Sequence, residues 1–230
     1  MADVGRCNYK QDIHPKDESP VDLVRVATYV NTMPAAIDMI EDAHRKGYET
    51  TCNIMAISNA KESDILGALD MLGKSPVDGI YIGDSYRSLF PEQSLNISDQ
   101  YLEIVENYGK YIGMHAHNNQ QLAFANTIDA LTNGVSYLDA TMKGMGRGAG
   151  NCAMELLLGF LKNPKYQLFP VLQFVEKYMV PLEEQGAIWG YDIPYMITGH
   201  LNQHPRTAIA ATKEQRKDSS SFFIAVEDKD

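Results

Sequence analysis

The 230-residue chain predicts an α/β fold in which parallel strands alternate with helices. Five short runs rich in β-branched and aromatic residues are each followed by a longer amphipathic stretch. The centres of the runs recur at about 25 to 31 residues, which is the length of one βαβ unit. Strict alternation predicts a parallel sheet with helices packed on its outside. Both an open doubly wound sheet and part of a (β/α)8 barrel fit this pattern, and periodicity does not separate them.

The apolar spacing and the positions of proline and glycine predict the individual elements. The first four residues are expected to be the tail of a strand, and Pro34 and Gly47 bracket the first helix. The predicted strands are 22–30, 49–58, 78–85, 110–117 and 136–142. The predicted helices that alternate with them are 34–47, 61–73, 98–108 and 120–132.

The character of the sequence changes after Asn151. Residues 152–162 and 169–185 are expected to be helical, and a turn-rich aromatic stretch from Trp189 to Tyr195 precedes another helix. The tail from Lys213 is charged and serine-bearing, and its end is expected to be poorly ordered. We expect one main domain over residues 1–200 and a C-terminal helix with a charged tail over 201–230.

Composition and charge exclude several classes of partner. The formal net charge is −10 and the isoelectric point is near 5.0, which argues against nucleic acid or an anionic membrane as a partner. An anionic metabolite can still bind through local cations, a metal or backbone N–H groups. The N-terminus lacks the apolar core of a signal peptide, and three scattered cysteines predict reduced thiols. We therefore expect a cytoplasmic protein.

His115 and His117 follow an apolar run and are separated by one residue. In an extended strand, side chains at positions i and i+2 point to the same face, so both imidazoles are expected to enter one space. Neutral imidazoles are common ligands of divalent metals. Taken alone, the pair is equally compatible with two hydrogen-bonded histidines at a strand end.

The loop from Gly144 to Gly150 has glycine at every second position and leads to Asn151. It matches neither a Walker loop nor a dinucleotide fingerprint. Backbone N–H groups before a helix are a suitable place for a carboxylate or phosphate, and Arg147 either adds charge there or faces water. Asn151 is interpreted as a helix N-cap or as a metal ligand through its amide oxygen. Asn118 and Asn119 are expected to cap the helix from residue 120.

Three charged residues interrupt otherwise apolar strands, namely Arg25, Asp84 and Asp139. A buried charge needs a partner, so these residues predict an arginine–carboxylate network lining the interior or mouth of the sheet. Near strand ends, Asp84 and Asp139 are placed to orient histidine ligands. A purely structural ion pair is an equally good interpretation.

Two segments carry a resemblance to a known family. Residues 113–131, GMHAHNNQQLAFANTIDAL, and 138–158, LDATMKGMGRGAGNCAMELLL, resemble the metal-dependent HMG-CoA lyase-like superfamily. The superfamily includes HMG-CoA lyase, 4-hydroxy-2-oxovalerate aldolase and the isopropylmalate and homocitrate synthases, and the chain is most similar to the aldolase branch. Supporting matches are residues 24–28 and Gly83-Asp-Ser85 followed by Pro91. The resemblance runs over about residues 1 to 200 and is most specific where the HxH and GxGxGAGN patterns occur together.

The resemblance implies a (β/α)8 TIM barrel that is incomplete here, comprising about strands four to eight and the C-terminal helices. It implies that His115 and His117 on strand seven, with Asn151 after strand eight, bind Mn²⁺ or Mg²⁺. In the family, the ion chelates a 2-oxo acid and stabilises the enolate released when a carbon–carbon bond breaks. The implied function is that of an aldolase or carbon–carbon lyase.

The resemblance also suggests roles for the remaining site residues. Arg25, Asp84 and Tyr195 are expected to be catalytic, with Tyr195 covering the cavity. Residues expected to contact the substrate are Asn53, Ser85, Asp139 and Gly148.

The chain departs from the family in one respect, because it has no DxxLRDG-type motif, which supplies a metal-binding aspartate and an arginine on the first strand. We expect a fragment of a longer gene product. The alternative is a catalytically incompetent barrel fragment that serves as a binding or regulatory module. An unpaired strand edge at residues 23–30 predicts a homo-oligomer, and a partner dehydrogenase is a further possibility.

Overall fold

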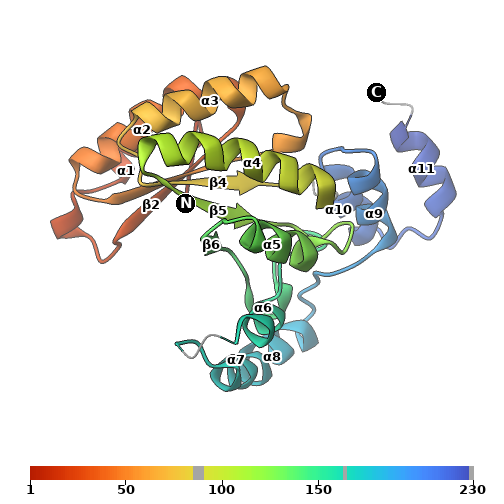
Figure 1. Ribbon diagram of the computed structural model, residues 1–230. Coiled ribbons are helices and arrows are strands. Elements are labelled where there is room, and N and C mark those ends of the chain that lie inside the picture. The colour runs from red at the N-terminus through yellow and green to blue at the C-terminus, as the bar shows by residue number, and fades with distance from the viewer. Residues whose placement is uncertain (85–90, 163–164, 228–230) are drawn as a thin grey trace. The chain divides into compact units, whose positions relative to one another are not determined.

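The computed structural model of the chain describes residues 1–84, 91–162 and 165–227 (Figure 1). The chain divides into two compact units. Unit 1 comprises Met1–Asp84, Glu92–His115 and Asp129–Leu138, and unit 2 includes Ala116–Ile128 and Asp139–Asp230. Among the described residues, no helix is both long enough and apolar enough to cross a membrane.

Unit 1 is built on a parallel sheet of six strands in the order β1-β2-β3-β4-β5-β6. The strands are β1 (Ala2–Asp3), β2 (Leu23–Thr28), β3 (Glu49–Ile54), β4 (Gly79–Gly83), β5 (Tyr111–His115) and β6 (Tyr137–Leu138). The five predicted strands and the N-terminal strand tail are confirmed. The predicted unpaired edge at residues 23–30 is wrong, because β1 pairs with Val26 and Ala27 of β2. A doubly wound sheet reverses its strand order at a switch point. Here each strand lies beside its predecessor, which is the winding of a barrel wall.

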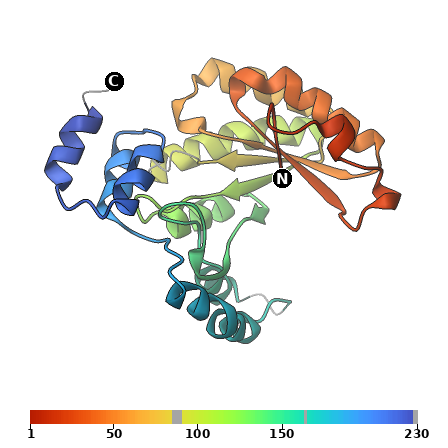
Figure 2. The same cartoon turned by 180° about the vertical axis from the view of Figure 1, so that it is seen from behind.

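The helices that connect the strands follow from this order. They are α1 (Tyr9–Asp12), α2 (Met33–Arg45), α3 (Glu62–Lys74), α4 (Pro91–Tyr108) and α5 (Ala123–Thr132). Short 3-10 turns occur at Lys16–Glu18, Val30–Thr32, Ile57–Asn59 and Met142–Gly144. Right-handed crossovers between successive neighbours place the connecting helices on one face of the sheet. Figures 1 and 2 show α2, α3 and α4 together on that face.

Two helix starts differ from the prediction. Helix α4 begins at Pro91 rather than at residue 98, since proline is favourable in the first helical turn. Helix α5 begins at Ala123 rather than at residue 120, because Gln121 has a left-handed backbone with φ of 61°. The Asn118 Oδ1 accepts a hydrogen bond of 3.2 Å from the N–H of Ala123, which confirms that Asn118 caps this helix.

The face of the sheet that carries the helices is apolar and fully buried. One row across four strands consists of Val26, Cys52, Ile80 and Ile112, each at most 2% exposed. The completely buried Tyr101 of α4 interacts with Cys52 across the helix–sheet interface. Burial of such residues is the main stabilising contribution to unit 1.

The opposite face is polar and aromatic, and glycines make room for its tyrosines. A Cβ atom at Gly79 would lie 2.1 Å from the ring of Tyr111, and one at Gly113 would lie 2.1 Å from the ring of Tyr81. Tyr111 also stacks on Tyr137, with ring centroids 4.0 Å apart. This arrangement requires glycine at both positions beneath the rings.

Unit 2 is mostly helical. Its first group comprises α6 (Met154–Leu161), α7 (Leu168–Phe174), a π-helical turn (Val175–Met179) and α8 (Val180–Glu184). Its second group comprises α9 (Ile193–His200), α10 (Arg206–Lys213) and α11 (Ser219–Glu227), which share a hydrophobic cluster. The helices predicted after Asn151 are confirmed. The last three residues of the tail lie outside the described residues, and the predicted division at residue 200 stays a prediction.

Candidate functional site

Strand β5 of unit 1 places His115 at its carboxyl end. His115 pairs in register with Gly83, and its carbonyl oxygen accepts a hydrogen bond of 3.3 Å from the N–H of Asp84. Asp84 is 1% exposed. Two of the predicted site residues therefore lie side by side at the ends of neighbouring strands.

Arg25 and Asn53 lie on the polar face of the same sheet as His115. The guanidinium of Arg25 is 3.8 Å from the ring centroid of Tyr81, and Asn53 pairs in register with Tyr81. Residues in register share a face of the sheet, and so do residues two apart along a strand. The Asn53–Tyr81 pair therefore lies on the same face as the Gly83–His115 pair, two residues earlier along the strands. Tyr81 is not among the site residues that the sequence predicts. The sequence pattern that could have identified Tyr81 is its alternation with glycines in residues 79–83.

The amide oxygen of Asn53 is buried near the end of its strand. It makes no hydrogen bond within the described residues. A Cβ atom at Gly83 would lie 2.6 Å from this oxygen, so a larger residue at Gly83 would displace the amide. The position of the Asn53 amide therefore depends on glycine at residue 83 of the neighbouring strand.

In unit 2, the segment after Ala116 is joined to the end of the glycine loop. His117 and Asn151 form an antiparallel bridge. The N–H of Asn118 donates to the carbonyl of Gly150 at 3.0 Å, and the N–H of Cys152 donates to the carbonyl of Ala116 at 3.3 Å. Directly opposed residues of an antiparallel pair project to the same side, so the side chains of His117 and Asn151 are neighbours.

The side chain of Asn151 is held in one orientation by the loop. Its Nδ2 donates to the carbonyl of Met145 at 3.0 Å, while its Oδ1 is buried and has no hydrogen-bond partner among the described residues. The interpretation of Asn151 as an N-cap is wrong, because α6 begins at Met154 and its N-cap position is Ala153. Asn151 thus presents an oriented amide oxygen rather than a cap.

The alternating glycines make the loop compact enough to hold Asn151. A Cβ atom at Gly146 would lie 2.4 Å from the Asn151 Nδ2, and one at Gly150 would lie 2.2 Å from the carbonyl oxygen of Gly144. Four backbone N–H groups of the loop, those of residues 144, 145, 150 and 151, donate to carbonyls of the chain itself. These four N–H groups are therefore not available to an anion. Arg147 is exposed and faces water.

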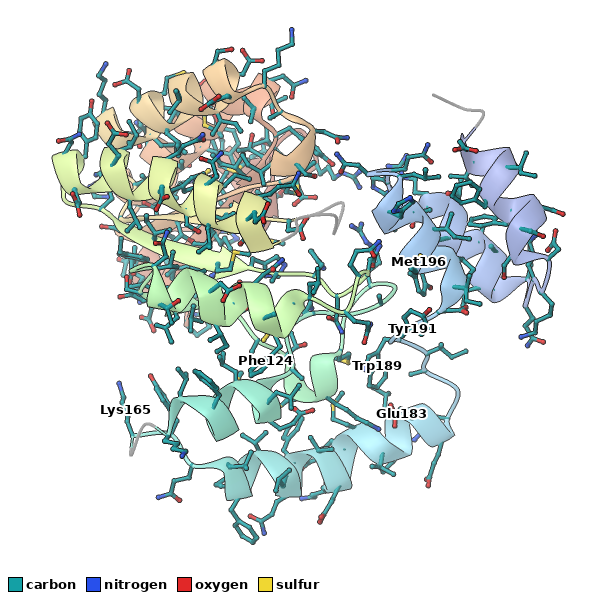
Figure 3. The ribbon with its side chains drawn as sticks, turned by 45° about the vertical axis from the view of Figure 1, so that its right-hand side comes forward. Phe124, Lys165, Glu183, Trp189, Tyr191 and Met196 are labelled. Atoms are coloured by element: carbon teal, nitrogen blue, oxygen red, sulfur yellow. The ribbon has the colours of Figure 1, made fainter. Side chains whose placement is uncertain are left out.

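A pocket of about 410 Å³ lies beside the loop within unit 2, and its walls include Asn151 and Lys143. The Trp189 Nε1 donates to the carbonyl of Lys143 at 3.0 Å, and Lys143 forms an ion pair with Glu183. Figure 3 shows Trp189 and Glu183 entering this region from the stretch before α9 and from α8. The sequence predicts Trp189 in an aromatic turn but does not indicate its place in a pocket.

Comparison with known proteins identifies the family. The sequence model of the HMGL-like family matches residues 24–172. The chain belongs to the HMGL-like family. The resemblance found in the sequence is therefore confirmed.

Several proteins of known name or structure are similar to the chain. A 4-hydroxy-2-oxovalerate aldolase from Bacillus thuringiensis is 28% identical over 70% of this chain and 47% of its own length. An oxaloacetate decarboxylase from Mycobacterium tuberculosis is 31% identical over 62% of this chain and 41% of its own length. The chain thus spans about half the length of the curated relatives it matches.

Two solved structures share the fold. The N-terminal domain of a proposed aldolase from Bacteroides vulgatus superposes with a TM-score of 0.72 at 29% identity, covering 91% of this chain and 72% of that one. The carboxyl transferase domain of Rhizobium etli pyruvate carboxylase superposes with a TM-score of 0.65 at 15% identity, covering 84% of this chain and 35% of that one. The second likeness concerns the fold alone.

The other predicted site residues of this HMGL-like chain are distributed over unit 2. Tyr195 on α9 is 6% exposed and belongs to the same cluster as Ala149 of the glycine loop. Gly148 has a φ of 68°, and its carbonyl accepts a hydrogen bond of 3.1 Å from the N–H of Gly190. Asp139 follows β6 and is half-buried. Ser85 lies outside the described residues.

The amide oxygen of Asn151 is of a type that fits a divalent ion. No cluster of three histidine, cysteine, aspartate or glutamate side chains suited to a metal occurs in the described part of the chain. The predicted set contains two imidazoles and one amide, and an amide is outside those residue types. The buried Oδ1 of Asn151, oriented by the hydrogen bond of its Nδ2, has the chemistry of an oxygen ligand.

Cys152 is adjacent to Asn151 but is not suited to nucleophilic chemistry. Burial raises the pKa of its thiol above the usual value, and a hydrogen bond with Thr127 only partly opposes this effect. A thiolate is the reactive form of cysteine. Cys152 therefore remains a neutral packing residue at neutral pH.

Proposed function

We propose that the chain provides most of the site of an aldolase-type lyase that cleaves or forms a carbon–carbon bond in a 2-oxo acid. Membership of the HMGL-like family and relatives named 4-hydroxy-2-oxovalerate aldolase support a lyase. The observation that carries the proposal is the His117–Asn151 bridge, which places an imidazole beside an oriented amide oxygen. The sequential parallel sheet then corresponds to part of a barrel wall.

The proposed metal ligands are His115, His117 and Asn151, and the ion is Mn²⁺ or Mg²⁺. Two observations support this set, namely the spacing of the two histidines and the buried Oδ1 of Asn151. A divalent ion bound there would act as a Lewis acid on the oxygens of a 2-oxo acid and stabilise developing enolate charge.

Arg25 supplies positive charge on the polar face of the sheet. Its guanidinium is held against the ring of Tyr81, which limits the orientations it can adopt. A fixed cation is suited to binding the substrate carboxylate or to stabilising an oxyanion. Asn53 is proposed to donate its amide to the substrate from the same face.

The remaining roles rest on the family resemblance and on position. Asp84 is proposed to act in catalysis at the end of β4, with Ser85 and Asp139 contacting the substrate. The backbone of Gly148 is proposed to line the substrate site, and Tyr195 is proposed to exclude water through its packing with Ala149.

A second candidate function is a metal-binding module without catalysis. The observation that favours it is that the candidate metal ligands, the two histidines and Asn151, lie in this sequence, whereas no DxxLRDG-type motif does.

A coupled assay separates the two functions. Purified chain is incubated with a 4-hydroxy-2-oxo acid and Mn²⁺, and pyruvate release is followed alongside Mn²⁺ binding. We expect release that falls by about a hundredfold or more in Arg25→Ala, because an oxyanion-stabilising group is lost. Arg45→Ala is the matched control, because Arg45 is 65% exposed on α2.

The outcomes of this assay are distinct. Binding without pyruvate release supports the second function. Absence of both binding and release contradicts both functions, and equal loss in the two arginine variants contradicts the role of Arg25.

A further inference from the structure

Lys143, at the start of the glycine loop, has a backbone conformation that residues with side chains rarely adopt. Its φ is 55°, in the left-handed region. For a residue other than glycine this conformation is unfavourable, and it persists only where surrounding contacts hold it. Such residues occur preferentially at functional sites. The contacts of Lys143 therefore indicate what holds this loop in place.

Three different elements of unit 2 hold Lys143. Its N–H donates to the Glu155 Oε2 of α6 at 3.0 Å, and its ammonium forms an ion pair with Glu183 of α8. Its carbonyl accepts a hydrogen bond of 3.0 Å from the Nε1 of Trp189, in the stretch between α8 and α9 (Figure 3). The N–H, the side chain and the carbonyl of one residue thus each have a partner, which leaves the left-handed backbone little freedom to relax.

Trp189 and Gly190 also hold the other end of the loop, and we call these two residues the loop clamp. The N–H of Gly190 donates to the carbonyl of Gly148 at 3.1 Å. A Cβ atom at Gly150 would lie 3.7 Å from the Cδ1 of Trp189, so the indole ring lies next to the backbone of Gly150. The loop clamp therefore contacts the loop at Lys143, Gly148 and Gly150, which are close to its two ends.

The positions that the loop clamp holds adjoin the groups that orient Asn151. The N–H of Asn151 donates to the carbonyl of Gly144 at 3.0 Å, and its Nδ2 donates to the carbonyl of Met145, also at 3.0 Å. Gly144 and Met145 directly follow Lys143, and Asn151 directly follows Gly150. A displacement of the backbone at residue 143 or 150 would therefore move the Asn151 amide or the carbonyls that hold it.

We propose that Trp189 is a positioning residue that fixes the orientation of the Asn151 amide through the glycine loop. The inference rests on the proposed function for the role of Asn151 as a metal ligand, whereas the positioning itself concerns contacts within unit 2. An indole is suited to this role because it combines a flat apolar surface for Gly150 with one N–H donor for the Lys143 carbonyl. A phenylalanine at residue 189 would keep an aromatic ring but lose the donor.

Hydrogen exchange tests the positioning without a metal. In Trp189→Phe, the amide protons of Gly144 and Asn151 should exchange about tenfold faster than in the wild type or more, because local opening of the loop costs less free energy once the loop clamp is weakened. Tyr191→Phe is the matched control, since it removes a polar group from an aromatic side chain two residues away that is 58% exposed. This variant should exchange as the wild type does. Unchanged exchange in Trp189→Phe overturns the proposal, whether or not the chain binds a metal.

A double-mutant cycle on Mn²⁺ affinity tests whether Trp189 acts through Asn151. Calorimetric titration should give a dissociation constant about 10- to 100-fold higher in Trp189→Phe, because a group that orients a metal ligand is lost. In an Asn151→Ala background, the same change at residue 189 should add no further loss, because the amide that Trp189 orients is absent. A purely structural effect of Trp189 would weaken binding equally in both backgrounds. Equal losses in the two backgrounds, or no loss in Trp189→Phe, overturn the proposal and leave the metal site intact.

The two experiments separate failure of the positioning from failure of the proposed function. A wild type that binds no Mn²⁺ contradicts the proposed metal site, and hydrogen exchange then decides the positioning alone. Circular dichroism shows whether Trp189→Phe is folded. If it is not, Trp189 is replaced by benzothienylalanine, whose ring has the same shape as indole but carries sulfur in place of the N–H. The same faster exchange is expected from this chain, and exchange at the wild-type rate overturns the proposal.

Discussion

The two faces of the sheet in unit 1 differ in composition, and the difference separates stability from chemistry. The face beneath α2, α3 and α4 carries isoleucine, valine and cysteine in continuous buried rows. The opposite face carries Arg25, Asn53 and His115, together with tyrosines that lie over glycines. Apolar packing on one face stabilises the fold, while the other face holds polar groups in fixed positions. Substitutions on the two faces should therefore have different consequences.

The largest effect is expected on the helix-bearing face. Ile82→Ala removes a completely buried side chain and should lower the free energy of unfolding by about 2–5 kcal/mol, through lost burial and a cavity. Ile188→Ala is the matched control, because Ile188 is 81% exposed, and it should change stability by less than about 0.5 kcal/mol. Urea unfolding measures both. Equal effects would show that the apolar face is not the core.

The next effect concerns the tyrosine–glycine pairs of the polar face. Gly113→Ala places a methyl group where the ring of Tyr81 lies and should cost about 1–3 kcal/mol of stability. Combining it with Tyr81→Ala should cost less than the sum of the two single changes, since the clash disappears. Thermal unfolding of the wild type, the two single variants and the double variant measures this difference. Strict additivity would mean that the ring does not lie over Gly113.

A smaller effect is expected in the glycine loop of unit 2. Gly146→Ala introduces a methyl group 2.4 Å from the Asn151 Nδ2. It should weaken Mn²⁺ binding by about 10- to 100-fold, because disturbing the groups that orient a metal ligand lowers metal affinity by this factor. Gly159→Ala is the matched control in α6, where a Cβ atom meets nothing within 4 Å. It should leave Mn²⁺ affinity unchanged. Calorimetric titration compares the two variants, and equal affinities would contradict the role of the loop.

The smallest expected effect is a fall in the free energy of unfolding as the pH rises above 9. Burial raises the pKa of the Cys52 thiol from 9.0 to about 12. Below pH 9 the thiol is neutral in both states, so its contribution to stability is complete. Between pH 9 and about 12 only the unfolded chain loses this proton, so stability should fall by at most about 1.4 kcal/mol per pH unit.

Comparison with Cys52→Ala isolates this contribution. Below pH 9 the variant should have lower stability because a buried side chain is shortened, but at higher pH it should lack the part of the alkaline slope that Cys52 causes. Urea unfolding at pH 8, 9, 10 and 11 gives both slopes. Identical slopes would show that the thiol ionises equally readily in the folded chain.

The fold was largely predictable because its signals are local. Apolar runs followed by amphipathic stretches specify strands and helices within one βαβ unit, and the five predicted strands were confirmed. The strand order and the pairing of Tyr81 with Gly113 were not predictable, because they depend on register between strands about thirty residues apart.

The candidate site shows the same limit. The sequence alone left Asn151 open between a cap and a ligand, because an asparagine before a helix suits both roles. Only the bond from its Nδ2 to Met145 and the start of α6 at Met154 exclude the cap. The spacing of His115 and His117 was readable from the strand period, whereas the His117–Asn151 bridge requires the path of the intervening chain.

The most direct test of the account is a calorimetric titration of Mn²⁺ into the wild type, His117→Ala and Asn151→Ala, with His44→Ala as the control. His44 lies on α2, outside the proposed ligand set. The account predicts one site in the wild type and the control, and affinity at least about tenfold weaker in the other two variants. Equal affinities in all four proteins would contradict the proposed metal site.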